Sequence, residues 1–202
     1  MLILSLDTSA NYVSVALVDE GRTYAFIEEE MDRGQAEALM PVIENVLKKA
    51  QKTMADIQGI AVTVGPGSFT GVRIGLASAR AFGLALGVPV YGVTCFEAWA
   101  YHLGRACKVV LDSKRDDYFV QSFNATGEAI DEPAILSAEK LKGELPFAAV
   151  GTGAEALAGE IGCEAVVKIS PIAVAVGRIA LTRLENPLPP KPLYMREADV
   201  TV

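Results

Sequence analysis

Residues 59–75 read GIAVTVGPGSFTGVRIG. An apolar, β-branched run ends at Gly-Pro-Gly and a helix-like apolar run follows, so this stretch predicts a strand, a tight turn and a helix over 71–87. Glycine-rich turns of this kind often bind phosphate at the helix N-terminus. It is not a P-loop, since no lysine lies between Lys52 and Lys108, and Thr70 breaks the dinucleotide fingerprint. Two interpretations stay open: the loop amides hold an anion, or the glycines only form a tight turn.

The helix after this turn carries a stripe of small residues, one at every fourth position. They are Gly71, Gly75, Ala79, Gly83 and Gly87. Glycine inside a helix costs up to ~1 kcal/mol relative to alanine, so the stripe needs a close neighbour, either another helix or a sheet. The remaining faces are apolar, and Arg73 and Arg80 are the only charges between positions 59 and 93. A helix that is apolar nearly all round needs cover on both sides, so we expect its own sheet and a partner chain.

The surrounding sequence predicts an α/β fold with the order βββαβαβ. The expected strands are 2–6, 12–18, 21–30, 60–64 and 88–93, with a helix over 35–50. A second half repeats the pattern in reduced form: KVVLDSKRDDYFVQSF (108–123) echoes LILSLDTSANYVSVAL (2–17), and FAAVGTGAEALAGEIG (147–162) weakly echoes the opening stretch. We therefore expect two related βββαβα lobes, the second one smaller.

The domain boundaries follow from this repeat and from proline content. The expected units are an N-terminal lobe with interface helices (1–103), a reduced second lobe (104–186) and a Pro-rich C-terminal arm (187–202). We favour an arm that packs on the body as a strap, and the alternative is a strand that binds a partner.

Composition excludes several classes of protein. With 18 basic and 25 acidic residues the net charge is −7, and no basic cluster exceeds the pair Lys114–Arg115, so we do not expect a chain that binds tRNA or DNA strongly by itself. Three scattered cysteines indicate a reducing cytoplasm rather than a disulfide framework or a thiolate zinc site. The N-terminal MLILSLD is expected to be a first strand and not a signal peptide. Arg80 and Pro89 argue against a membrane span over 74–93.

Catalytic groups are scarce. His102 is the one histidine, so any Ser-His-Asp or Cys-His site would need it. Ser68 lies in PGSFTG, which is not a nucleophile elbow. Asp7, at the end of the first strand, could hold Mg²⁺ through water or could cap its turn, and both alternatives stay open.

Five segments together resemble the bacterial TsaB (YeaZ) family of accessory factors in tRNA threonylcarbamoyladenosine synthesis. They are LSLDTSANYVSVAL, GQAEALMPVIENVL, AVTVGPGSFTGVRIGLASARAFG, LDSKRDDYFVQ and KPLYMR, and the similarity runs from Leu2 to about Arg196. The GPGSFTGxRIG block is specific, whereas the Asp-Thr-Ser start is shared with actin-like ATPases. The resemblance implies an actin-like (ASKHA) fold of two lobes.

The resemblance also implies candidate site residues. The catalytic paralogue TsaD, once classed as a glycoprotease, binds a metal through an H-x-x-x-H pair, and Cys95 and Trp99 stand at those two places here. This implies a chain with no catalytic residue and no metal site. Many relatives carry histidine where Gln35 stands, which leaves the role of Gln35 open. The implied partner-interface residues are Leu39, Ile43, Val46, Gly71, Arg73, Gly75, Ala79, Phe82 and Gly83. Candidates for nucleotide or anion contact are Asp7, Thr8, Ser9, Gly67 and Ser68.

The resulting hypothesis is a cytoplasmic, non-catalytic scaffold that dimerises with TsaD, forms a homodimer when alone, and helps to recruit the ATPase TsaE. TsaC would supply threonylcarbamoyl-AMP, tRNA would bind only through the complex, and no membrane would be involved. No cofactor would be required, although ATP or ADP could lie at the subunit boundary. Three alternatives remain: a metallopeptidase-like enzyme, a small-molecule kinase of the actin-like superfamily, and a free homodimeric binding module.

Overall fold

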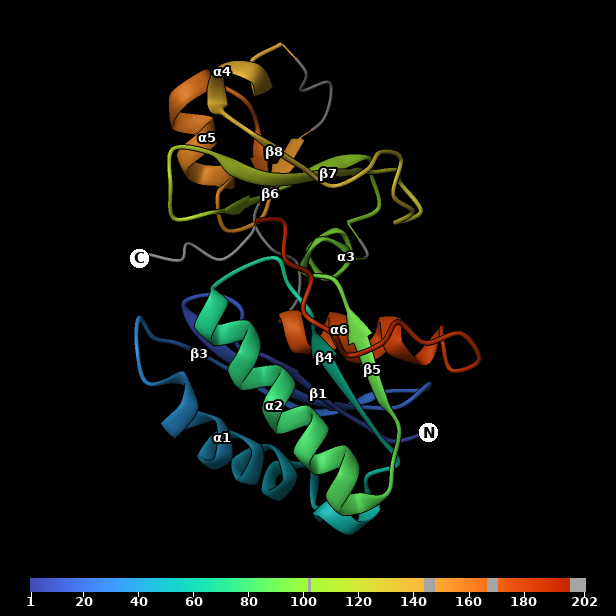
Figure 1. The fold of residues 1–202 in the computed structure, drawn as a ribbon. Helices are drawn as coiled ribbons and strands as arrows, with labels where there is room; N and C mark the ends of the chain where they lie inside the picture. The colour runs from blue at the N-terminus through green and yellow to red at the C-terminus, as the bar shows by residue number, and fades with distance from the viewer. Residues whose placement is uncertain (102, 144–147, 167–170, 197–202) are drawn as a thin grey trace.

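The computed structural model describes residues 1–101, 103–143, 148–166 and 171–196, which form two lobes stacked on one another (Figure 1). The first lobe contains β1 (Ile3–Asp7), β2 (Tyr12–Val18), β3 (Thr23–Glu30), α1 (Gln35–Ala50), the short 3-10 helix η1 (Met54–Asp56), β4 (Gly59–Thr63), α2 (Phe69–Leu86) and β5 (Val90–Val93). The connecting helix α3 (Cys95–Ala100) leads to β6 (Cys107–Asp112), β7 (Tyr118–Phe123), β8 (Ala134–Leu136), α4 (Ala138–Leu141), β9 (Ala148–Val150), α5 (Ala154–Ile161), β10 (Ala165–Val166) and finally α6 (Ile172–Leu181).

The two lobes have the same topology, which confirms the repeat predicted from the sequence. The first sheet has the order β3-β2-β1-β4-β5, and the second has β8-β7-β6-β9-β10. In each lobe the first three strands are antiparallel, and the last two run parallel to the first. The second lobe is reduced as expected, because β9 and β10 have three and two residues where β4 and β5 have five and four.

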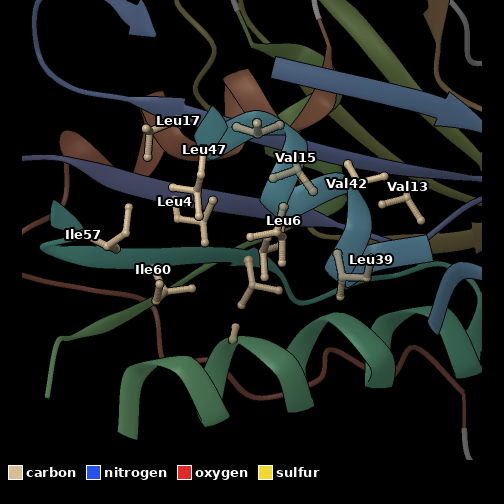
Figure 2. Close-up of a cluster of buried hydrophobic side chains, with 14 of the residues drawn as sticks. Leu4, Leu6, Val13, Val15, Leu17, Leu39, Val42, Leu47, Ile57 and Ile60 are labelled. Atoms are coloured by element: carbon tan, nitrogen blue, oxygen red, sulfur yellow. The ribbon is translucent and has the colours of Figure 1, made fainter. Parts of the chain in front are cut away.

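One face of the first sheet packs against α1 and α2. Strands β1 and β2 are buried along their whole length, and alternate residues such as Leu4, Leu6 and Val15 point toward these helices (Figure 2). Helix α1 contributes Leu39 and Val42 to the same cluster. Burying each such side chain contributes roughly 1.5–3 kcal/mol, so this layer is the main hydrophobic core of the first lobe.

The opposite face of the same sheet is covered by α6, which comes from the far end of the chain (Figure 1). The Ser5 hydroxyl donates to the Ala173 carbonyl at 2.6 Å, and the Ala173 amide donates to the Ser14 hydroxyl at 3.1 Å. Helix α6 falls within the segment predicted as the second lobe, 104–186, but it packs on the first sheet. The first lobe is therefore built from two separate stretches of chain.

The lobes are joined by α3, which packs on one face of the second sheet (Figure 1). Phe96 of α3 is fully buried together with Val109 and Phe123 of that sheet. Helices α4 and α5 cover the sheet's other face around Leu141 and Leu157. No helix in the described part of the chain is both long and apolar enough to cross a membrane.

Candidate functional site: the interlobe cleft and the outer face of α2

The glycine-rich loop lies directly against the turn that follows β1. The Ser68 amide donates to the Ser9 carbonyl at 2.7 Å, and the Thr8 hydroxyl donates to the Gly71 carbonyl at 2.7 Å. A Cβ atom at Gly67 would lie 2.5 Å from the Ser9 carbonyl oxygen, which no side chain tolerates. The glycines are thus required because two backbone segments touch, and the tight-turn interpretation has direct structural support.

Helix α2 begins at Phe69, two residues before the predicted start, because Ser68 caps it. The Ser68 hydroxyl accepts from the Gly71 amide at 3.2 Å, and the Ser68 carbonyl accepts from the Val72 amide. Two of the amides that a bound phosphate would use at this helix N-terminus, those of Ser68 and Gly71, already have protein acceptors.

Asp7 lies beneath this contact with both carboxylate oxygens occupied. It accepts hydrogen bonds from the Ser9 amide (2.8 Å), the Tyr12 phenol (2.7 Å) and the Thr63 hydroxyl (2.6 Å), and it is fully buried. Burial, followed by the charge of Asp7, raises the pKa of the Tyr12 phenol well above its ordinary value. The Asp7 carboxylate therefore anchors the turn after β1. Sequence reasoning identified Asp7 but missed Tyr12 and Thr63 as its partners.

Cys95 belongs to the same buried network. Its thiol donates to the Ser9 hydroxyl at 3.2 Å. Burial, and then the nearby Asp7 charge, raises the pKa of the Cys95 thiol far above its ordinary value. The thiolate is the nucleophile and the metal ligand, so a thiol held protonated in this way is poorly suited to either role.

A cavity of about 580 Å³ opens between the lobes above this network. Ser9, Gly67 and Ser68 line its first-lobe side, and Asp112 and Thr152 line the other. Trp99 and Lys114 also line the cavity, and the Lys114 ammonium pairs with the Asp112 carboxylate at 3.0 Å. The structure thus brings the predicted anion-contact residues together, with Ser9, Gly67 and Ser68 at the cavity surface and Asp7 and Thr8 buried beneath it.

The positions implied for a metal pair are occupied by Cys95 and Trp99, from the start and the end of α3. Among the described residues, no group of three His, Cys, Asp or Glu side chains is arranged to hold a metal ion. His102 lies outside the described residues. Gln35, at the start of α1, donates to the Ala10 and Met31 carbonyls at 3.4 and 3.3 Å.

The structure corrects the predicted partner interface for most of its residues. A Cβ at Gly75 would lie 2.9 Å from the Thr8 hydroxyl, and one at Gly83 would overlap Val90. The small-residue stripe of α2 therefore faces its own sheet, which is the close neighbour that the glycines require. Seven predicted interface residues are buried within the chain: Leu39, Ile43, Val46, Gly71, Gly75, Ala79 and Gly83. Arg73 is exposed and Phe82 is half-buried, so these two stay as predicted contacts.

The side of α2 away from the sheet carries apolar residues that the described part of the chain leaves exposed or only partly covered. Leu84 is 86% exposed, Ala77 and Ala81 are exposed, and Ile74 is partly exposed. We call these four residues the outer α2 face. Leu84 is the large, mostly exposed side chain of this group, and with its three apolar neighbours on the same side of the helix it forms a candidate surface for binding another protein.

An ion pair fixes the joint between the lobes. Glu97 accepts hydrogen bonds from the Thr94 amide and hydroxyl, both at 2.9 Å, and forms an ion pair with Arg183, which follows α6. Burial alone would raise the pKa of Glu97, but the hydrogen bonds from Arg183 and Thr94 outweigh it and lower this pKa below its usual value. The carboxylate thus caps α3 and ties it to α6.

We expect Glu97→Gln to lower the free energy of unfolding at pH 7 by about 1–2 kcal/mol, since a charge-assisted hydrogen bond is lost. A depressed carboxyl pKa stabilises the fold above the unfolded value, about 4.3, and this stabilisation is lost as the pH falls through the folded pKa. The difference between wild type and variant should therefore shrink below about pH 4.3, as urea unfolding at several pH values would measure. A difference that stays constant down to pH 3 would contradict this role.

Comparison with known proteins agrees with this architecture. Residues 24–173 match the family described as TsaD, tRNA N6-adenosine threonylcarbamoyltransferase. The chain is 32% identical to an uncharacterized protein of Mycobacterium tuberculosis over 98% of its own length and 92% of that protein. It is 28% identical to the Escherichia coli tRNA threonylcarbamoyladenosine biosynthesis protein TsaB, covering 94% of this chain and 85% of that protein.

A solved structure shares the fold. YeaZ from Pseudomonas aeruginosa superposes with a TM-score of 0.79 at 24% sequence identity, covering 96% of this chain and 99% of that one. The predicted actin-like fold of two related lobes is thereby confirmed. The match of residues 24–173, which span well over half of the chain, shows that this protein belongs to the TsaD/TsaB (YeaZ) family.

Proposed function

We propose that this chain is a non-catalytic scaffold subunit for threonylcarbamoyl transfer to the adenosine beside the tRNA anticodon. In this proposal the outer α2 face docks on the catalytic TsaD subunit of the same cell. The observation that carries the proposal is this uncovered apolar face, on a helix set in place by the family's glycine-rich loop.

The side chains in and beneath the interlobe cleft support a non-catalytic role. An indole cannot ligate a metal, and a single buried, protonated thiol gives no closed site, so Trp99 and Cys95 are poor substitutes for a histidine pair. The Asp7 carboxylate is already engaged by three donors of its own chain. These features disfavour the metallopeptidase and kinase alternatives.

The remaining partners follow from the same role. The assembled pair would recruit the ATPase TsaE and would use threonylcarbamoyl-AMP made by TsaC, in the cytoplasm. The net charge of −7 supports tRNA binding through the complex rather than by this chain alone. ATP or ADP at the subunit boundary would meet Ser9, Gly67 and Ser68 at the cavity surface.

Reconstitution tests the proposal. The purified chain, mixed with the TsaD protein of the same organism, should elute as a heteromeric complex in size-exclusion chromatography with light scattering. Threonylcarbamoyl transfer from threonylcarbamoyl-AMP to tRNA should then depend on the chain when TsaD and TsaE are present. Transfer at the same rate without it would overturn the scaffold role. A homodimer that never exchanges subunits with TsaD would favour the free binding module instead.

A further inference from the structure

The segment KPLYMR, residues 191–196, belongs to neither sheet, yet it contacts both lobes. It follows a stretch of arm that runs along the free edge of β5, where the Gly92 amide donates to the Leu188 carbonyl at 2.8 Å. From there the chain passes α3 toward the second lobe, as the red trace shows (Figure 1). The described part of the arm is thus packed on the body, as the strap interpretation expects.

On the first lobe, this segment contacts the residue after β4 and the start of α2. The Leu193 amide donates to the Val64 carbonyl at 2.7 Å. The Tyr194 ring lies 5.7 Å from the ring of Phe69, and the Tyr194 hydroxyl accepts from Arg73 Nε at 3.0 Å. Arg73 also stacks over Phe69 at 3.7 Å. The first turn of α2 is therefore tied to the arm by an aromatic pair and a guanidinium.

On the second lobe, the next two residues make a different pair of contacts. Met195 packs against the cluster that contains Phe119 of the second sheet. Arg196 forms an ion pair with Asp117, and the Ser113 hydroxyl donates to the same carboxylate at 2.6 Å. Asp117 is therefore also held by a contact within the second lobe that does not depend on the arm.

The contacts of the arm with the first lobe and its contacts with the second lobe are very close together in sequence. Tyr194 and Arg196 are two residues apart, and an extended chain spans at most about 7 Å over that separation. A cavity of about 530 Å³ separates the start of α2 from the second lobe here, with Phe69 on one side and Phe119 on the other. Direct packing between the lobes is incomplete at this point, and the arm bridges the gap.

We propose that residues 193–196 form an interlobe latch. The latch fixes the second lobe against the first and ties its position to the first turn of α2. A movement that separates the lobes here must either break the arm's contacts with one lobe or displace the start of α2. Residues 193–196 then link the orientation of the second lobe to the conformational stability of the first turn of α2.

Two measurements on one variant test the latch. Spin labels at Lys48→Cys and Glu155→Cys, on exposed sites of α1 and α5 in a Cys163→Ser background, report the distance between the lobes. Arg196→Ala should broaden or shift the narrow distribution expected for the parent protein. The same change should speed hydrogen exchange at the amides of residues 69–73 by about threefold to tenfold, the range for losing a partly buried, charge-assisted hydrogen bond.

Faster hydrogen exchange at residues 69–73 could not be a direct effect of the lost ion pair, because Arg196 pairs with Asp117 of the second lobe and not with α2. Arg105→Ala is the matched control: it breaks an exposed ion pair with Glu164 inside the second lobe and should leave both readouts unchanged. If Arg196→Ala does not fold, Asp117→Asn removes the same ion pair with almost no change of shape.

Each outcome decides the proposal. An unchanged distance distribution in a folded variant would overturn the latch. A changed distribution with unchanged exchange at residues 69–73 would overturn the link to α2 and leave a simple tether. The latch is supported if Arg196→Ala changes both the distance distribution and the exchange at residues 69–73, and if Arg196→Lys changes them less. Lysine keeps the positive charge but loses the fork geometry of the guanidinium.

Discussion

Gly71→Ala should destabilise this protein by at least ~3 kcal/mol and lower its melting temperature by roughly 6–12 °C. A Cβ at this position would fall far inside van der Waals contact of the Thr8 carbonyl oxygen. The neighbour is backbone, which is held by the hydrogen bond from the Thr8 hydroxyl to the Gly71 carbonyl itself. Neither segment can move without disturbing the turn after β1 or the start of α2. Thermal and urea unfolding of the purified variant would measure the loss.

Gly159→Ala is the matched control, since Gly159 is also helical but lies exposed in α5 with nothing within 4 Å of a Cβ. That change should be neutral or should stabilise by about 0.5–1 kcal/mol, because it reduces the entropy of the unfolded chain. Equal effects of the two alanines would show that the contact with Thr8 does not require glycine at position 71.

The sequence predicted the duplicated topology because local patterns determine it. Most strands of the first lobe are short apolar runs bounded by turn residues, and the echo of residues 2–17 in 108–123 required only a comparison of two segments. The reduction of the second lobe was also visible in its sequence. Local periodicity carries no information about which sheet a distant helix covers, so the return of α6 to the first sheet was missed.

The side of α2 that is left exposed could not be predicted from its sequence pattern. A stripe of small residues predicts close approach but does not say to what, and here Gly75 and Gly83 approach their own sheet. The partners of Asp7 were missed for a related reason. Thr63 lies 56 positions away in sequence, and only the parallel pairing of β1 with β4 brings its hydroxyl to the carboxylate.

The outer α2 face gives the second large expected effect. Ala81→Arg should weaken binding to the TsaD partner by about a hundredfold, because an unpaired charge would be buried where two apolar surfaces meet, at a cost of about 3 kcal/mol. Ala81 is exposed in the free chain, and arginine is nearly as good a helix former as alanine. The melting temperature of the isolated variant should therefore stay close to that of the parent. Titration calorimetry with TsaD would measure the affinity.

Ala156→Arg in α5 is the control for this change, since it places the same charge on an exposed helix of the second lobe and should leave the affinity unchanged. The pair of variants also separates the two proposed uses of the outer α2 face, binding of TsaD and self-association. If Ala81→Arg abolishes homodimers of the chain but leaves TsaD binding intact, the outer α2 face serves self-association alone, and the scaffold must dock through another surface. If both associations weaken together, homodimer and heterodimer compete for one face, and adding TsaD should dissociate the homodimer in proportion to its concentration.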